Sequence, residues 1–236
     1  MLFVTGAGIS ADSGLPTYRG IGGLYEQETT DDGVPIEAAL SGAMFQRDPT
    51  ITWKYIHQIE SSCRDAGPNR AHEVIAELED RFDRVWTLTQ NVDGLHHAAG
   101  SRQVIDIHGD VHWLVCTRCG HRWRVESYAG LTIPPGCTEC DSLVRPEVVL
   151  FGEMLPLDRV RVLQEQLMRG FDAVFSIGTT SVFPYIAEPV IDARRRGGLT
   201  VEINPGSSEV SHLVNYRLQM GAAAAMEALV DALDCV

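Results

Sequence analysis

The chain has 236 residues, and 32 acidic against 19 basic side chains give it a formal net charge of −13 at pH 7. That charge argues against a protein that binds nucleic acid through its phosphates, whereas an acidic surface suits cationic partners or serves only solubility. No apolar run approaches the ~20 residues that span a bilayer, and the N-terminus lacks the basic start and cleavage site of a secretory signal. We therefore expect a cytoplasmic protein without membrane contact.

The predicted strands are short apolar or β-branched runs that end in small or polar residues. In chain order they lie at 1–8, 84–91, 102–109, 171–180 and 198–205. Helical patterns lie at 70–82, 157–170, 187–198 and 221–233. Strands that alternate with helices predict an α/β fold, a Rossmann-like doubly wound parallel sheet.

Two segments interrupt this alternation. Residues 20–71 contain no convincing strand, but Asp48 and Pro49 are a typical cap and first residue for a helix over DPTITWKYIHQIESS. Residues 113–146 hold two cysteine pairs and several polar turns. The expected large domain consists of residues 1–24, 72–112 and 147–236. The expected small domain consists of a helical module, 25–71, and the cysteine-containing segment, 113–146.

The first predicted strand runs into a glycine loop, VTGAGISADSGLPTYRG. Gly6, Gly8 and Ala11 fit the dinucleotide fingerprint, in which glycines let backbone N–H groups approach a pyrophosphate at a helix N-terminus. The same glycines also suit a plain turn between a strand and a helix. The lysine of a phosphate-binding P-loop is absent, and no strand precedes Glu26 or Asp31, the acidic residues near the spacing that dehydrogenases use. A nucleoside triphosphatase and an ordinary hydride-transfer enzyme are therefore disfavoured.

Four cysteines form two pairs, Cys116-x-x-Cys119 and Cys137-x-x-Cys140, separated by residues 120–136. Four thiolates at this spacing predict a tetrahedral Zn²⁺ site, a zinc ribbon. Because sulfur fills all four positions, no place remains for water or substrate, and we expect the zinc to be structural. A redox dithiol is the alternative for a single pair, but two pairs at this spacing disfavour it.

With these pieces placed, the chain resembles the sirtuins, the NAD-dependent protein lysine deacylases. The matching motifs, in the family's order, are GAGISADSGLPTYRG, TQNVDGLHHAAG, IDIHGD, the split cysteine ribbon, RPEVVLFGE, GTTSVFP and EINP. They run from residue 6 to 205. The resemblance implies NAD as co-substrate, acylated-lysine proteins or peptides as partners, and acyl transfer to ADP-ribose with release of nicotinamide. Many relatives have a helix before the first strand, so the chain is either a minimal sirtuin of the prokaryotic type or a trimmed one.

The resemblance also implies which residues bind NAD. They are Gly6, Ala7, Gly8 and Ser10 at the pyrophosphate, Tyr18 and Arg19 on the cofactor loop, Gln90, Asn91 and Asp93 at the ribose and nicotinamide, and Gly178, Thr179, Ser181 and Asn204 towards phosphate and adenosine ribose. The family usually has Phe-Arg where this chain has Tyr18 and Arg19. The role of Asn204 explains why no early acidic residue is needed, because a later strand supplies the ribose contact.

Three of these motif residues are implied to be catalytic. Asn91 and Asp93 can hold the nicotinamide carboxamide through complementary donor and acceptor groups. His108 is implied to be the base that takes a proton from a ribose hydroxyl, so that the oxygen can close onto the acyl carbon. Histidine suits this task because its pKa lies near neutral pH and its neutral form accepts a proton.

The acylated peptide is implied to pair as an added strand between two segments. The substrate-binding residues are Val148, Val149, Phe151, Gly152 and Glu153 from one segment and Val182 and Phe183 from the other. An apolar stretch such as VVLF is also compatible with a core strand. Sirtuins that prefer succinyl or malonyl lysine carry a Tyr and an Arg where an ungapped match places Ile56 and Ile59, so we expect a preference for acetyl or other neutral acyl groups.

Two alternative functions stay open at this point. Mono-ADP-ribosyl transfer to protein shares the first chemical step with deacylation. A non-catalytic reader of NAD or of acylated lysine is disfavoured by the presence of His108 together with Asn91 and Asp93. The target protein and the oligomeric state are not indicated by the sequence.

Overall fold

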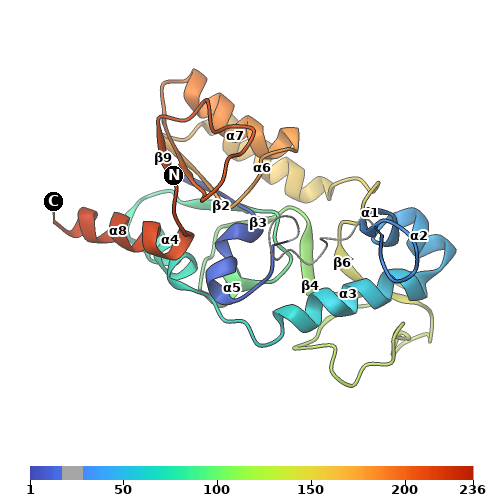
Figure 1. The fold of residues 1–236 in the computed structure, drawn as a ribbon. Helices are drawn as coiled ribbons and strands as arrows, with labels where there is room; N and C mark the ends of the chain where they lie inside the picture. The colour runs from blue at the N-terminus through green and yellow to red at the C-terminus, as the bar shows by residue number, and fades with distance from the viewer. Residues whose placement is uncertain (18–28, 236) are drawn as a thin grey trace.

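Six parallel strands form the central sheet of the computed structural model, which describes residues 1–17 and 29–235 (Figure 1). They are β1 (Leu2–Thr5), β2 (Trp86–Thr89), β3 (Val104–Asp106), β7 (Ala173–Ile177), β8 (Leu199–Ile203) and β9 (Tyr216–Leu218). Their order, β3-β2-β1-β7-β8-β9, places β1 between β2 and β7, with all neighbours parallel. The predicted doubly wound sheet is confirmed. Strand β9 was not predicted, because its three residues form no apolar run.

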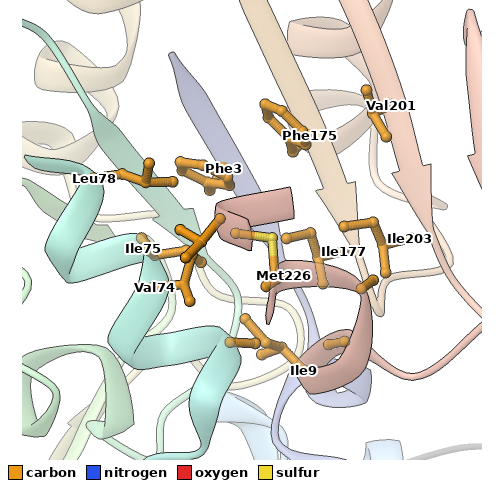
Figure 2. Packing of buried hydrophobic residues seen from close by; sticks show 14 of the residues in the cluster. Phe3, Ile9, Val74, Ile75, Leu78, Phe175, Ile177, Val201, Ile203 and Met226 are labelled. Carbon is orange, nitrogen blue, oxygen red and sulfur yellow. The ribbon is translucent and has the colours of Figure 1, made fainter. Parts of the chain in front are cut away.

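Helices cover both faces of this sheet. Helices α4 (Arg70–Arg81) and α8 (Ala222–Asp234) contact one face, and α6 (Leu157–Arg169) and α7 (Pro184–Arg195) contact the other. Strand β1 shows the reason, since Phe3 points to the first face while Leu2 and Val4 point to the second. Figure 2 shows Phe3 beside Phe175 and facing α4, with a ring-centroid distance of 4.9 Å between the two phenylalanines. Each fully buried side chain of this size contributes about 1.5–3 kcal/mol.

A second, three-stranded antiparallel sheet lies beside the central one. It has the order β5-β4-β6, made by β4 (Gly109–Cys116), β5 (Arg122–Arg124) and β6 (Val144–Val148). Helices α1 (Ile36–Ala39), α2 (Gly42–Arg47) and α3 (Pro49–Cys63) pack on it and share one hydrophobic core with it. This sheet crosses the predicted boundaries after residues 112 and 146, and the division into two domains stays a prediction.

Trp53 is the centre of that smaller core. Its side chain is fully buried, its Nε1 donates to the carbonyl oxygen of Val144 at 2.9 Å, and its ring lies 5.6 Å from that of Tyr128. The helix that carries it begins as predicted, because the Asp48 carboxylate accepts the amide of Thr50 at 3.1 Å and Pro49 is the first helical residue. The helical module therefore packs directly against the cysteine-containing segment.

The glycine loop does not lead into the α-helix that a dinucleotide fingerprint predicts. Two short 3₁₀ helices, Ala7–Ile9 and Ala11–Ser13, follow β1. Gly14 then takes a left-handed conformation with φ +83°, and Pro16 follows it. A left-handed residue and a proline both end helical hydrogen bonding, so the expectation of a helix at this point was wrong.

Helix α7 begins at Pro184, three residues before the predicted start at residue 187. Proline at the first helical position loses no hydrogen bond and supplies a helical φ. The shift brings Tyr185 into the first turn of the helix. Within residues 1–17 and 29–235, no helix has the length and apolar character needed to cross a membrane.

A buried histidine links α4 to the glycine loop. His72 is fully buried, and its Nδ1 accepts the amide of Asn69 at 3.3 Å. The Asn69 side chain donates in turn to the carbonyl oxygen of Ile9 and to Ser13. Burial lowers the pKa of His72 to about 4. Its ring meets that of His96 edge-on, with centroids 4.8 Å apart.

This environment predicts acid sensitivity of the fold. The unfolded chain protonates residue 72 near its ordinary pKa of about 6.5, whereas the folded chain does so only near 4. The contribution of the neutral His72 to the free energy of unfolding is therefore fully present above pH ~6.5 and is lost as the pH falls to about 4. The total loss is roughly 3 kcal/mol. Urea unfolding between pH 7 and 4.5 should show a shallower pH dependence in His72→Gln, which keeps a side-chain acceptor for the helix cap.

His212→Gln is the matched control, because residue 212 is exposed. It should keep the pH dependence of the natural chain. An equally steep dependence in His72→Gln would show that residue 72 does not carry the effect.

Candidate active site

The loops that follow β1, β2, β7 and β8 meet at the carboxyl edge of the central sheet. Thr5 pairs with Thr89 on one side and with Ile177 on the other, so these three strands end at one level. The chain order reverses between β1 and β7, and ligands of open α/β sheets bind at such a switch point. The predicted NAD-binding residues within the described parts of the chain follow these strand ends; Tyr18 and Arg19 lie outside the described residues.

The glycine loop after β1 contacts the loop after β7 through bare backbone. The amide of Gly8 donates to the carbonyl oxygen of Gly178 at 2.9 Å. A Cβ on Gly8 would lie 2.6 Å from the Cα of Gly178, and a Cβ on Gly6 would lie 2.8 Å from the Gly178 oxygen. Gly178 itself has φ +59°. All three glycines are therefore required by this contact, whatever else they bind.

A buried polar network joins the loop after β2 to the glycine loop. Asn91, only 5% exposed, donates through Nδ2 to the carbonyl oxygen of Gly6 at 3.1 Å and to the Ser10 hydroxyl at 3.2 Å. The Ser10 hydroxyl donates to Oδ2 of Asp93 at 2.7 Å, and Oδ1 of Asp93 accepts the amide of Leu95 at 3.0 Å. Burial raises the pKa of Asp93, although both hydrogen bonds oppose it. The carboxylate and the amide are thus fixed side by side in a partly desolvated site.

A second network spans β2, β7 and β8. Gln90 donates through Nε2 to the Thr179 hydroxyl at 2.8 Å, and Asn204 donates through Nδ2 to the carbonyl oxygen of Thr179 at 3.1 Å. Ser181 is buried with φ +54°, and its amide donates to the Thr179 hydroxyl at 3.1 Å. A non-glycine residue in this left-handed region is held there by its surroundings, as often found at functional sites.

His108 lies at the same edge and is held at both ring nitrogens. Its Nδ1 is 3.1 Å from the carbonyl oxygen of Gln90, and its Nε2 is 2.7 Å from the hydroxyl of Tyr185. Burial lowers the pKa of His108, against the opposing effect of the Gln90 carbonyl. The imidazole is therefore neutral at pH 7. Tyr185 was not among the predicted site residues, because the expected helix started at residue 187 and the matched motif ended at Pro184.

The two segments expected to hold a peptide differ in exposure. Val182 and Phe183 are 60% and 41% exposed, and Phe151 is 45% exposed. Leu150, by contrast, is buried in the smaller core, so the alternative reading of VVLF as core is correct for that residue. The amide of Phe151 donates to the Leu40 carbonyl, and its own carbonyl accepts the amide of Gly42. The backbone of Phe151 is thus paired within the chain, while its side chain is exposed.

The remaining peptide-segment residues pack inward or pair locally. Val148 ends β6 opposite Gly109, and the amide of Val149 donates to the carbonyl oxygen of His108 at 2.8 Å. Glu153 forms a two-pronged ion pair with Arg145 at 2.7 and 2.8 Å. Burial alone would raise the pKa of Glu153, but the hydrogen bonds from Arg145 and from the Leu150 amide, together with the charge of Arg145, lower it. The geometry gives Glu153 a structural partner within the chain.

A pocket opens beside Asn91 and Asp93. Its wall includes Ser10 and Ala7 from the glycine loop and Ile59 and Cys63 from α3. Burial raises the pKa of the Cys63 thiol to about 12, so this cysteine stays protonated and unreactive. Helix α3 thus contributes to the site, a contribution that periodicity alone did not reveal.

The four paired cysteines converge away from this edge, on the three-stranded sheet. Their Sγ atoms all lie within 4.8 Å of one another, with Cys116 and Cys140 3.5 Å apart and Cys119 and Cys137 3.7 Å apart. A tetrahedral Zn²⁺ with Zn–S bonds of about 2.3 Å separates its sulfurs by about 3.8 Å. The four thiols therefore fit one zinc ion, and no fifth group is needed.

Comparison with known proteins places this geometry in a family. A family model described as the Sir2 family matches residues 6–184. The chain is 48% identical over 221 residues to NAD-dependent protein deacylase 2 of Pseudomonas aeruginosa, covering 92% of this chain and 86% of the relative. It is 50% identical over 233 residues to NAD-dependent protein deacylase 2 of Pseudomonas syringae pv. tomato, covering 98% and 94%. The chain belongs to the Sir2 family.

Solved Sir2 structures share the whole architecture. A Sir2 homologue in complex with NAD superposes with a TM-score of 0.86 at 37% identity, covering 99% of this chain and 88% of that one. A Sir2 complex with a p53 peptide and NAD⁺ gives 0.83 at 30% identity, covering 100% and 93%. The predictions of a sirtuin, of an NAD-dependent enzyme and of a structural zinc are confirmed. The relatives above are named deacylases, which supports deacylation and not the alternative of ADP-ribosyl transfer.

The cysteine cluster predicts that metal removal destabilises the smaller core. Stripping the protein with a strong zinc chelator should lower its melting temperature, because Cys116 and Cys137 are buried among the side chains of that core. Cys119→Ser should reduce the zinc content measured by atomic absorption and lower the melting temperature similarly.

Cys63→Ser is the control, since residue 63 lies outside the cluster. It should keep one zinc per chain. A fully stable, zinc-free protein after chelation would contradict a structural role for the metal.

Proposed function

We propose that this Sir2 protein removes acyl groups from lysine side chains of proteins, transferring the acyl group to ADP-ribose and releasing nicotinamide. The observation that carries the proposal is the short loop at 90–93. Its first carbonyl holds the neutral His108, and its side chains Asn91 and Asp93 line the adjacent pocket. A base and a carboxamide-binding pair are thus anchored on the same four residues.

Asn91 and Asp93 match the two sides of a carboxamide. The nicotinamide group presents an NH₂ donor, which the Asp93 carboxylate can accept, and an oxygen, which an N–H of Asn91 can bind once it leaves its present acceptor, the Gly6 carbonyl or the Ser10 hydroxyl. The Ser10 hydroxyl accepts from Nδ2 of Asn91 and donates to Oδ2 of Asp93, so both side chains are already oriented before substrate arrives. Because these side chains are already oriented, binding of nicotinamide would strain the glycosidic bond of NAD and would require little rearrangement of the protein.

His108 has the state that a general base requires. Its Nδ1 must carry the proton, because the Gln90 carbonyl can only accept, and the lone pair therefore lies on Nε2. The pKa lowered by burial keeps the ring neutral at physiological pH. In the proposed reaction this nitrogen takes the proton of a ribose hydroxyl, which lets the oxygen bond to the acyl carbon.

The rest of the dinucleotide would lie along the strand ends. Gly6, Ala7, Gly8 and Ser10 are proposed at the pyrophosphate, with Gln90, Thr179, Ser181 and Asn204 towards the riboses and Gly178 as the backbone contact between the loops. The amides of Gly6 and Gly8 already donate to the carbonyl oxygens of Ile177 and Gly178, so these two amides do not bind the phosphates. The glycines would instead allow the phosphates to approach the backbone closely, because no side chain stands in the way. Tyr18 and Arg19 are kept as proposed cofactor contacts on the sequence alone.

The acylated peptide is proposed to lie between residues 148–153 and 181–183. The exposed side chains of Phe151, Val182 and Phe183 supply apolar contact, and Phe183 lies with its ring 6.2 Å from that of His108. Backbone pairing with a peptide is indifferent to its sequence, so substrates of varied sequence are expected.

The test is incubation of an acetylated-lysine peptide with NAD, with nicotinamide and acyl-ADP-ribose measured by chromatography and the peptide by mass spectrometry. The natural chain should release nicotinamide as the peptide loses an acetyl group. His108→Ala should lower product formation about 100-fold or more, as expected for loss of a general base. Asn91→Ala should lower nicotinamide release as well, because residue 91 acts in the earlier step.

His97→Ala is the matched control, since its side chain is 47% exposed. It should keep full activity. A peptide that gains ADP-ribose, or no nicotinamide release with any acyl peptide, would contradict the proposed reaction.

The acyl preference follows from two buried isoleucines of α3. Ile56 and Ile59 are 2% and 7% exposed, and Ile59 lines the pocket beside Asn91 and Asp93. A carboxylate placed against these side chains would lose its hydration without gaining a partner. Acetyl-lysine and butyryl-lysine peptides should therefore be processed faster than the succinyl-lysine peptide of the same sequence, by at least about 10-fold in kcat/KM.

Butyryl and succinyl groups have the same chain length, so this pair separates charge from size. Faster removal of succinyl than of acetyl from one peptide would refute the assignment of residues 56 and 59.

A further inference from the structure

Tyr185 stands between His108 and the solvent-exposed loop before α7. Its hydroxyl is 2.7 Å from Nε2 of His108. Its ring stacks on that of Phe183 at 5.5 Å and an angle of 15°, and it meets the imidazole at 82°. Nothing in the sequence motifs marked this residue, yet it contacts the one nitrogen that the reaction uses.

The direction of the hydrogen bond follows from the other side of the ring. The carbonyl oxygen of Gln90 can only accept, so Nδ1 of the neutral His108 carries the hydrogen. Nε2 then has only a lone pair, and Tyr185 must donate its O–H to it. Burial raises the pKa of Tyr185 to about 12, so the hydroxyl keeps its proton at neutral pH.

The basic lone pair of His108 is therefore covered by a hydroxyl group. In this arrangement a proton reaches Nε2 through the Tyr185 oxygen, which has lone pairs of its own and can accept from a substrate hydroxyl while it donates. A phenylalanine would pack in the same place but would leave the half-buried lone pair without a donor. Packing alone therefore explains the aromatic ring of Tyr185 but not its hydroxyl oxygen.

The position of this oxygen is rigid. Tyr185 belongs to the first turn of α7, which is fixed to the sheet by the fully buried side chains of Ile186 and Val190. His108 is fixed from the other side by the Gln90 carbonyl. Groups mounted on packed elements hold hydrogen-bond geometry better than groups on free loops.

We propose that Tyr185 is a further catalytic residue, which relays the ribose proton to His108. The O–H bond of the ribose hydroxyl breaks as an O–H bond forms on Tyr185, and the original Tyr185 O–H bond breaks as an N–H bond forms on Nε2. One proton is lost by the ribose and one is gained by the imidazole, the tyrosine ends as it began, and nothing is oxidised or reduced. This relay rests on the proposed deacylase function.

The experiment uses Tyr185→Phe and measures the two halves of the reaction separately. Exchange of labelled nicotinamide into NAD, with an acyl peptide present, reports cleavage of the glycosidic bond, which needs no ribose deprotonation. Formation of acyl-ADP-ribose in a single turnover reports the later step. We expect exchange within about 3-fold of the natural chain and product formation lowered by about 10-fold or more, a smaller loss than the ~10²–10⁴-fold typical of removing the base itself, because His108 remains.

Two further readouts separate a relay from a purely structural role. The double variant Tyr185→Phe, His108→Ala should be no slower than His108→Ala alone, because both residues act in one proton transfer. In mixtures of H₂O and D₂O, the single-turnover rate of the natural chain should depend on two moving protons and that of Tyr185→Phe on one. Tyr216→Phe, at a residue that is 62% exposed, should match the natural chain in every assay.

Product formation by Tyr185→Phe at the natural rate would overturn the relay and show that the hydroxyl is simply displaced when NAD binds. Failure of the natural chain itself to release nicotinamide would instead overturn the proposed function, so the two failures are distinguishable. If Tyr185→Phe melts at a lower temperature, both proteins are compared at a temperature at which both are fully folded. Equal rates of product formation there would also overturn the relay.

Discussion

The contact between the backbones of Gly8 and Gly178 is the constraint on which the rest of the site depends. Strand β1 is paired in parallel with both β2 and β7, so three loops leave the sheet at one level. Two of them can approach closely only because neither carries a side chain at the point of contact. This approach brings Thr179 within reach of Gln90, and Gln90 in turn holds His108. A single methyl group at Gly8 would clash with the backbone of Gly178 and would separate the loops that carry Thr179, Gln90 and His108.

The second organising effect is burial of ionisable groups that keep their hydrogen bonds. Burial raises the pKa of Asp93 and lowers that of His108, so both groups are shifted towards their neutral forms. Each has partners that hold it in one orientation, Ser10 and Leu95 for the carboxylate and Gln90 and Tyr185 for the imidazole. Perturbed groups with fixed orientation are typical of catalytic sites.

The junction between the two sheets lies directly beside the proposed base. His108 is followed by Gly109, the first residue of β4, whose φ is +93° and whose Cβ would lie 1.9 Å from the carbonyl oxygen of Glu147. The His108 carbonyl also accepts the amide of Val149. The cysteine cluster at the far end of β4 and the core around Trp53 therefore stabilise the strand that follows His108, the proposed catalytic base, although they lie outside the site itself.

The sequence by itself determined the alternation of strands and helices, the cysteine cluster and the motif residues at the strand ends, because each of these depends on local spacing or on one strand's polarity. The start of α3 at Asp48 and Pro49 was predictable for the same reason. The 3₁₀ helices that replace an α-helix within residues 7–13, the three-residue β9 and the early start of α7 were not, since a left-handed glycine, an exposed edge and a proline cap outweigh periodicity there. Only the tertiary structure decided that Tyr185 meets His108 and that Ile59 and Asp93 line one pocket, because these pairs are far apart in the chain and no local pattern connects them.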